Sequence, residues 1–466
     1  MSRETPSLLR TRGLKPCGLA LIGLLLISSA SQAETDLQKL LAMFDTTGQE
    51  TLSLTLAEVL ERAVSRPQAR AAQERAKAAE MNAETVRRET LWPLVQVDAS
   101  LNARDRDFEF DTPLGAFTLG DSTSTAGNVS VIQPILDPAE RFHALPAAQH
   151  QAESARQSAG RTRQSLRAEA AQRFLDVLAN QAQIRATESF IESLEARLSE
   201  TAERVDAGRS LESDAIKVKL DLQSAILDLT TLRMARGVLL SDLGRVIGHP
   251  GLVEPDFDGP YDLDLPLELN AWIDRATAGR PDLLALTARR MALEERAAAE
   301  RATRLPRLEA GANWAVSDGD PFQPDELIQG SLNVRWTPFR SKTRQTRRAA
   351  LTAEAEAITH EIEELRRLVT VEIQLSLAQL AQSRATVAVR QTGIELAAET
   401  SRVERERYQS GRSTANDLLD AEAALRRQRT DHALAQIEVL RAWIRLTFAV
   451  GDDTIWPGGP GEETGS

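Results

Sequence analysis

The stretch ERVDAGRSLESDAI, residues Glu203–Ile216, returns in the same plan as ERYQSGRSTANDLL, residues Glu406–Leu419. Each copy holds a Gly-Arg-Ser triplet, and the sequence on both sides of it is long, charged and free of proline. Glycine readily adopts the left-handed backbone that ends a helix. Each copy therefore predicts a tight turn between two long antiparallel helices, and the chain is expected to contain two helical hairpins of one design.

Outward from these turns, further pairs of segments match in the same order, which makes the chain a tandem repeat. The pairs are RAVSRPQARA (Arg62–Ala71) with RATAGRPDLLA (Arg275–Ala285), LWPLVQVDASLNA (Leu91–Ala103) with RLPRLEAGANWAV (Arg304–Val316), and VSVIQPILDPAER (Val129–Arg141) with LNVRWTPFRSKTR (Leu332–Arg344). The copies are 213 or 214 residues apart in the first two pairs and 203 or 204 apart in the third pair and the turns. A single difference in loop length, between the two strand segments, explains the change.

Long helices are predicted on both sides of each turn, at 138–206, 211–247, 342–409 and 414–450. In the first helix the apolar residues fall at spacings of seven, three, four and seven: Ile184, Ile191, Leu194, Leu198 and Val205. This spacing is typical of a coiled-coil seam. At about 1.5 Å per residue, such a helix is roughly 100 Å long, which a compact globular domain cannot accommodate.

Before each long helix the apolar period changes to two, which predicts strands. Val95, Val97 and Leu101, for example, alternate with polar residues. The predicted strands span about 93–110, 125–136, 305–317 and 327–339, so each repeat holds one hairpin. Aromatic residues gather near the hairpin ends and favour a girdle at a membrane surface over a buried core: Phe108, Phe110, Phe117, Trp314, Phe322 and Trp336.

The resulting domain plan has five parts: a leader at 1–33, a first repeat at 34–248, a linker at 249–266, a second repeat at 267–450 and a tail at 451–466. The linker contains four prolines and no apolar period, which predicts an extended connection. The tail is rich in glycine and is predicted to be disordered.

The leader has the features of a secretory signal peptide. Basic residues precede the apolar run Leu19–Ile27, and Ser31-Gln32-Ala33 supplies small residues at a cleavage site. The run is too short to cross a bilayer as a helix, so cleavage after Ala33 is expected. The single cysteine, Cys17, lies in the leader. A disulfide framework and thiolate chemistry are therefore excluded from the expected mature chain.

Charge argues against nucleic acid as a partner. The formal charge is −12, and removing a leader with four basic residues and one acidic residue leaves about −15. Binding to a polyanion needs clustered Lys and Arg. The isolated basic cluster RSKTRQTRR, Arg340–Arg348, is interpreted as a solvated helix start or as a contact with a membrane surface.

Catalysis is not expected either, and neither a cofactor nor a metal is predicted. The sequence shows no nucleophile–base spacing, no glycine-rich phosphate loop and no paired carboxylates of the kind that active sites use. Apart from the leader, the chain has no long run of apolar residues that would predict a membrane-spanning helix. Any membrane crossing is therefore expected to use strands.

Two hairpins cannot form a complete transmembrane structure by themselves, because open sheet edges would leave backbone groups unpaired in hydrocarbon. Closure is therefore expected to come from other copies of the chain. A barrel assembled from several protomers, with the long helices forming a hollow tube beneath it, satisfies both the strands and the helices.

At this point the sequence resembles the TolC-type outer-membrane efflux proteins, the outer membrane factors. The resemblance rests on the repeat, the Trp92-Pro93 and Leu305-Pro306 steps, the segment Gln133–Asp137 (QPILD) and the paired Gly-Arg-Ser turns. It implies a mainly α fold with a transmembrane β-barrel: a homotrimer with a twelve-stranded barrel in the outer membrane and a helical tunnel crossing the periplasm. The duct would dock an inner-membrane transporter through a periplasmic adaptor, with drugs, metal ions and polypeptides all open as cargo.

The resemblance also implies site residues at the far end of the helices. Four residues would form the gate: Asp214, Tyr408, Asp417 and Asp420, with Tyr408 bonded to Asp214. The turns Gly208-Arg209-Ser210 and Gly411-Arg412-Ser413 would be the tips that dock the adaptor. Where one family member has a gate arginine, this chain has Ser413. From the residues alone, the two acids after the second turn are better explained as a solvated face near a helix start, where the helix dipole favours carboxylates.

A second interpretation is a periplasmic adaptor or coiled-coil scaffold, which also uses a long helical hairpin. Adaptors set one such hairpin within β-rich domains, whereas this sequence predicts two hairpins and few other strands. The export channel is therefore the preferred prediction.

Overall fold

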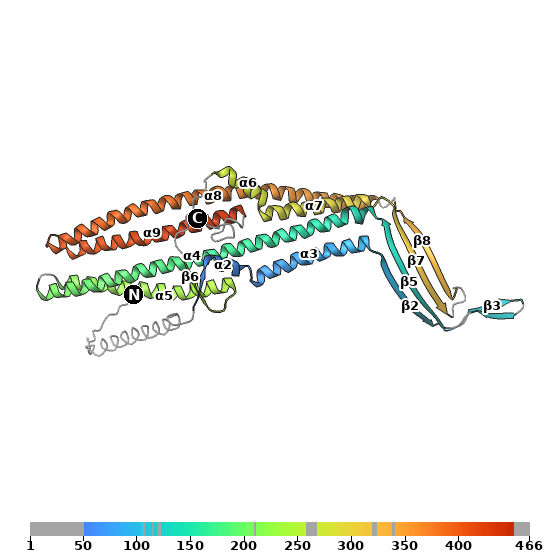
Figure 1. Ribbon diagram of the computed structural model, residues 1–466, viewed down its shortest axis with the longest axis horizontal. Coiled ribbons are helices and arrows are strands. Elements are labelled where there is room, and N and C mark those ends of the chain that lie inside the picture. Colours follow the sequence, from blue (N-terminus) through green and yellow to red (C-terminus); the bar gives the residue numbers. More distant parts are fainter. Residues whose placement is uncertain are drawn as a thin grey trace, which may run out of the picture.

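A computed structural model describes residues 51–103, 105, 108–113, 115–119, 123–208, 211–257, 268–318, 324–337 and 341–451. The predicted leader and nearly all of the predicted tail lie outside the described residues, as do Phe322 and Arg340. The molecule is elongated, with long helices at one end and a sheet at the other (Figure 1).

Two long helical hairpins run side by side in the described part of the chain (Figure 1). The first joins α4 (Leu145–Asp206) to α5 (Glu212–Ile247), and the second joins α8 (Ser341–Gln409) to α9 (Ala415–Val450). The first long helix begins later than the predicted residue 138, because a short π-helix, η1 (Glu140–Ala144), precedes it.

Shorter helices pack along the long helices α4 and α8 (Figure 1). They are α2 (Leu56–Ala63), α3 (Pro67–Leu91), α6 (Leu269–Gly279) and α7 (Pro281–Ala302). Both α3 and α7 have proline at their first position, where its missing N–H costs no hydrogen bond. The repeat seen in the sequence is thus also a repeat of helix starts.

The hairpin strands of both repeats join in one antiparallel sheet with the order β2-β5-β7-β8. Its strands are β2 (Leu94–Ala103), β5 (Thr123–Leu136), β7 (Arg307–Asp318) and β8 (Glu326–Arg335). The two repeats meet where β5 pairs with β7, in a register that places Val129 opposite Trp314.

The first predicted strand was too long. It was expected to reach residue 110, but β2 ends at Ala103, and Phe108–Thr112 forms a separate strand, β3, paired with β4 (Gly115–Leu119). Gly115 has a φ of 127°, a backbone conformation that glycine adopts without strain. The predicted loop between the strands therefore carries a small hairpin of its own.

The predicted linker was also wrong in part, because it contains a strand. Within residues 249–266, β6 (Leu252–Asp256) pairs in parallel with β1 (Thr51–Thr55) from the start of the described chain. Leu54 and Val253 are buried at this pairing. The two strands lie about 200 residues apart in the sequence, so no local sequence pattern indicates that they pair. The pairing, and with it the burial of these two side chains, is seen only in the folded chain.

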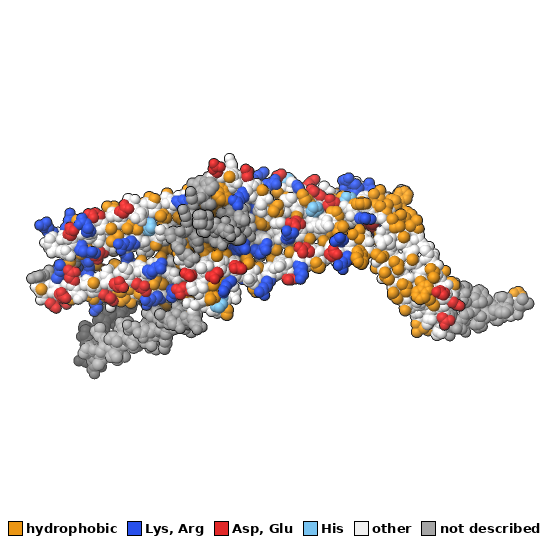
Figure 2. Space-filling model, in the orientation of Figure 1, with side chains coloured by type: hydrophobic (Ala, Val, Ile, Leu, Met, Phe, Trp, Pro, Cys, Tyr) orange, Lys and Arg blue, Asp and Glu red, His pale blue; other side chains and the backbone are white. Residues whose placement is uncertain are grey.

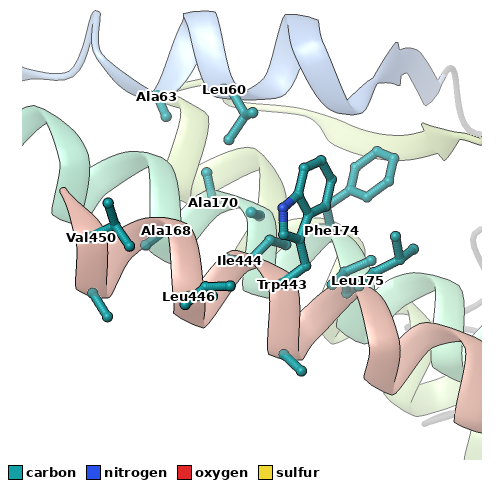
Figure 3. Packing of buried hydrophobic residues seen from close by; sticks show 14 of the residues in the cluster. Leu60, Ala63, Ala168, Ala170, Phe174, Leu175, Trp443, Ile444, Leu446 and Val450 are labelled. Atoms are coloured by element: carbon teal, nitrogen blue, oxygen red, sulfur yellow. The ribbon is translucent and has the colours of Figure 1, made fainter. Parts of the chain in front are cut away.

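The main core lies where α2, α4 and α9 converge (Figure 3). Phe174 and Leu175 of α4 are buried there together with Trp443 and Ile444 of α9. Alanines such as Ala170 lie among them, and small side chains allow helices to approach closely.

Two arginines, Arg280, which is buried, and Arg161, which is partly buried, secure the end of α9. Arg280 donates to the carbonyl of Ala449 at 2.9 Å and to Glu372 at 2.6 Å. Arg161 of α4 donates to the carbonyl of Phe448 at 2.9 Å. Burial, with the charge of Arg280 as a second cause, lowers the pKa of Arg161 to about 10. The C-terminal carbonyls of α9 are thus paired by a side chain of α4 and by Arg280, which joins α6 to α7.

Replacing Phe174 with Ala should lower the free energy of unfolding of the helical body by about 3–5 kcal/mol, because the side chain is fully buried and leaves a cavity. The measurement is denaturant unfolding followed by circular dichroism in detergent. Phe142→Ala is the matched control, since Phe142 is 57% exposed. Equal losses in the two variants would contradict the assignment of the core.

Candidate functional site

The two hairpin tips close through glycines in the left-handed backbone conformation. Gly208 has a φ of 66° and Gly411 a φ of 73°. The N–H of Gly208 donates to the carbonyl of Val205 at 2.9 Å, and that of Gly411 to the carbonyl of Tyr408 at 3.0 Å. Any residue with a Cβ is strained at this φ, so backbone geometry favours glycine at both tips.

The predicted tip residues are mostly exposed where the structure describes them. Gly208, Gly411 and Arg412 are exposed, and Ser413 is half-buried. The Oγ of Ser413 lies 2.8 Å from Oε2 of Glu404. Arg209 and Ser210 lie outside the described residues.

Asp417 caps the helix that follows the second tip. Its Oδ2 accepts from the N–H of Thr414 at 3.0 Å and from the Thr414 hydroxyl at 2.7 Å. These hydrogen bonds, first those of the hydroxyl and then that of the backbone, lower the pKa of the Asp417 carboxyl below its usual value. Local hydrogen bonds thus account for the position of Asp417 within one protomer.

The other two predicted acids are placed differently. Asp214 repeats the capping arrangement at the first tip, where its Oδ2 accepts from the N–H of Leu211 at 3.3 Å. Asp420 is exposed, one turn beyond Asp417 on α9. How these acids of several protomers lie around an axis is outside a single chain, so the acidic constriction stays a prediction.

Tyr408 lies at the contact between the two hairpins and is only 5% exposed. The guanidinium of Arg204, on α4, lies 3.9 Å from the centre of its ring. Burial raises the pKa of the Tyr408 hydroxyl, and the negative charges of Glu200 and Asp214 act in the same direction. The predicted hydrogen bond from Tyr408 to Asp214 stays a prediction.

An ion-paired network that the sequence did not predict holds the hairpins together behind the tips. Arg197 of α4 donates to Oε2 of Glu422 on α9 at 2.9 Å, and Arg405 of α8 donates to the other oxygen at 3.0 Å. The signal in the sequence is a polar stripe at seven-residue spacing beside the apolar seam, in which Arg197 precedes Arg204 by two turns. A search that considers only the apolar residues of the seam does not find these polar positions.

At the opposite end, the sheet has two different faces. One face is apolar, as the register shows by placing Val97 opposite Val129, Val129 opposite Trp314 and Trp314 opposite Ile328. The other face is polar across the same strands, with Gln96, Ser130, Asn313 and Gln329 in one row. Hydrophobic side chains gather over this end of the molecule, whereas charged side chains cover the helices (Figure 2).

Two tryptophans are exposed where the helices meet the sheet. Trp92 follows α3 and is 70% exposed, and Trp336 follows β8 and is 62% exposed. The indole Nε1 of Trp336 donates to the carbonyl of Arg304 at 2.9 Å. In the described part of the chain, none of the helices is apolar over a long enough stretch to span a membrane.

Residues 272–452, which make up most of the second repeat, match the family model of outer membrane efflux proteins. No curated protein sequence is significantly similar to the chain.

Solved structures of outer-membrane channels share the fold at low sequence identity. VceC from Vibrio cholerae is 15% identical, with a TM-score of 0.71, over 85% of this chain and 96% of that protein. The channel CmeC from Campylobacter jejuni is 14% identical, with a TM-score of 0.70, over 85% of each chain. The open state of the outer membrane channel MtrE from Neisseria gonorrhoeae is 17% identical, with a TM-score of 0.66, over 85% of this chain and 88% of that protein.

Long helical hairpins joined to a two-faced sheet are the fold that this chain shares with these outer-membrane proteins, as the sequence predicted. Residues 272–452 thus match a model of outer membrane efflux proteins, and the described part of the chain has the fold of VceC and CmeC.

The capping geometry predicts different effects for the two acids on α9. Because Asp417 has a lowered pKa, its ionised form stabilises the helix start above the usual carboxyl pKa, and this contribution is lost as the pH falls through the lowered value. Asp417→Ala should therefore increase amide hydrogen exchange at 414–420, and acid should do the same in the unmodified protein. Asp420→Ala, the control, should leave exchange there unchanged; similar exchange in both variants would contradict a capping role.

Proposed function

We propose that three copies of this chain form a passive export duct through the outer membrane and across the periplasm. The observation that carries the proposal is a sheet with one apolar face, one polar face and two open edges, attached to rods of packed helices. In this assembly the apolar face meets lipid, and the polar face lines the duct.

The open edges support assembly from several copies. Among the described residues, β2 and β8 each have one neighbouring strand in the sheet. An unpaired edge is costly in hydrocarbon, because its backbone N–H and C=O groups have no partner. Joining β8 of one copy to β2 of the next removes every edge, and three copies of a four-stranded sheet give twelve strands.

The helices support the same assembly through their repeat. One face of α4 is covered within the chain by α9: Gln164, Ala168, Ala171, Leu175, Leu178 and Ala182 are all buried. The repeat-related positions on α8, 203 residues later, are all exposed: Arg367, Val371, Gln374, Ala378, Ala381 and Ala385. Ala168 is 8% exposed, whereas its counterpart Val371 is 58% exposed.

The helix that would cover this face is α5 of a neighbouring copy, since α5 is the repeat counterpart of α9. Its Leu220, Leu227 and Val238 are more than half exposed, although they are apolar. Packing α8 against α5 of the next copy would bury both exposed stripes and close a ring of helices. The contact between α8 of one copy and α5 of the next would then be equivalent to the contact between α4 and α9 within one chain.

The distal tips are proposed to meet the partner proteins. Both turns point away from the sheet at the far end of the helices (Figure 1). Their exposed glycines and Arg412 offer a similar surface from each repeat to a periplasmic adaptor, which would connect the duct to an inner-membrane transporter. Energy for transport would come from that transporter, because the duct itself performs no reaction.

The gate is proposed to lie just inside these tips. In a trimer, Asp417 and Asp420 of three copies would form a ring of up to six carboxylates, which attracts cations. The contact of Tyr408 with Arg204 joins the two hairpins near this ring, and a bond from Tyr408 to Asp214 would add to it. The closed state would then depend on contacts between hairpins that are already present within one protomer.

The orientation of the sheet can be tested with single cysteines, because the expected mature chain has none. In outer-membrane vesicles, cysteines at Val97 and Trp336 should react with a lipid-soluble maleimide, since both side chains belong to the apolar face or its end. The matched positions Asp98 and Arg335, one residue away on the other face, should react only with a water-soluble reagent. Equal labelling of the two sets would contradict the proposed duct.

The gate can be tested by conductance in planar bilayers. Replacing both Asp417 and Asp420 with Ala should weaken cation selectivity and block by multivalent cations, because the negative field is removed without added bulk. Tyr408→Phe should raise conductance and leave selectivity unchanged, since it removes a hydroxyl and no charge. If the double Asp variant keeps its full cation preference, the two acids are not part of the gate, and their role is limited to the solvated start of α9.

A further inference from the structure

The start of α8 carries a cluster of cations that neither the fold nor the proposed duct requires. The cluster consists of Lys342, Arg344, Arg347 and Arg348, and the first acidic residue of the helix is Glu354. Lys342, Arg347 and Arg348 are exposed, and Arg344 donates to the carbonyl of Thr337 at 3.1 Å. Among the described residues, none of the four is paired with a carboxylate.

These charges are placed against the local electrostatics of the helix. A helix N-terminus carries a partial positive charge, so cations there are unfavourable. By contrast, Arg88 and Arg301 lie in the last turns of α3 and α7, where the dipole favours them. The repeat counterpart of the cluster, at 139–145, has Arg141 as its single Lys or Arg, beside Glu140. Helix formation therefore explains the basic ends of α3 and α7, and leaves the basic start of α8 unexplained.

The position of the cluster identifies the kind of anion it would meet. α8 begins at Ser341, a few residues after β8 ends at Arg335, with the exposed Trp336 between them. Exposed tryptophan is typical of the boundary between hydrocarbon and headgroups. Trp92 marks the same junction at the first strand, and basic side chains gather where the helical body meets the sheet (Figure 2).

We propose that Lys342, Arg344, Arg347 and Arg348 form a binding surface for anionic phospholipid headgroups in the periplasmic leaflet of the outer membrane. The proposal rests on the proposed membrane position of the sheet. With the apolar face of the sheet in lipid, the first two turns of α8 lie at headgroup depth, where the long side chains can reach phosphates. The bound anions would offset the unfavourable charge at the helix start.

The test compares lipid selectivity at the protein surface in reconstituted vesicles. Spin-labelled phosphatidylglycerol and phosphatidylcholine are added in turn, and electron spin resonance measures the fraction of each that the protein immobilises. Unmodified protein should prefer phosphatidylglycerol, and the preference should fall with added salt. In Lys342→Gln/Arg347→Gln/Arg348→Gln the preference should decrease about twofold or more. Arg344 is retained because its bond to Thr337 supports the turn.

The matched control is Lys217→Gln/Lys219→Gln/Arg427→Gln, which removes the same charge from exposed positions on α5 and α9, far from the sheet. This control should keep the full preference for phosphatidylglycerol. Unchanged lipid preference in the α8 variant would overturn the proposal. A change in ion selectivity of the conducting channel, without a change in lipid preference, would also overturn it and place the cluster in the duct.

Failure of the duct itself would look different. All lipid measurements use protein that has inserted and conducts, so a protein that neither inserts nor conducts would contradict the proposed function before lipid selectivity is measured. Loss of lipid preference in the α8 variant, with insertion and conductance retained, is the result expected from the proposal.

Discussion

The pairing of β5 with β7 is the interaction on which the rest of the architecture depends. It joins the hairpin of each repeat into one continuous sheet and places Val129 beside Trp314 on a common apolar face. Because side chains alternate strictly along strands, a shift of one residue would exchange the apolar and polar faces. The register therefore determines which side of the sheet can meet lipid. It also fixes where α3 and α7 end at the sheet and where η1 with α4, and α8, begin after it, and hence how the two repeats lie beside each other.

The repeat is nearly symmetric in sequence but not in its environment. α4 is covered on two faces, by α5 of its own repeat and by α9 of the other, whereas α8 packs against α9 and leaves the related second face open. The same asymmetry affects the helix ends. The end of α9 is held by Arg161 and Arg280, whereas the main helical neighbours of α5 are α4 and α2 of its own repeat. The contact that α4 makes with α9 therefore has no counterpart on α8 within the described part of the chain, and in the proposed duct another copy would supply it.

At the tips, the residues of the proposed gate also make structural contacts within the chain. Asp417 and Asp214 accept hydrogen bonds from the backbone at the starts of α9 and α5. Their carboxylates therefore stabilise these helix starts within one protomer, whether or not they also form a gate. Tyr408 packs between hairpins against Arg204, close to the Arg197–Glu422 pair. A motion that separates the hairpins at their tips must break the contact of Tyr408 with Arg204 and the Arg197–Glu422 ion pair together. Opening of the tips is therefore coupled to the packing between the two hairpins.

Local sequence determined the helical hairpins, the alternating strands and the glycines at the turns, because these features depend on periods of a few residues and on the backbone freedom of Gly208 and Gly411. The same local patterns, with the family resemblance, identified the outer-membrane channel fold. They did not predict the strand pair β1 and β6, the separate hairpin at Phe108–Thr112, or the pairing of Arg197 with Glu422. Each of the first and last joins residues about 200 positions apart, and the second depends on a turn at Gly115 within an apparently simple loop. Only the tertiary structure decided these three features. It alone also revealed which repeat-related faces are covered, because burial depends on what packs against a residue. Related positions of the two repeats can therefore be buried in one repeat and exposed in the other.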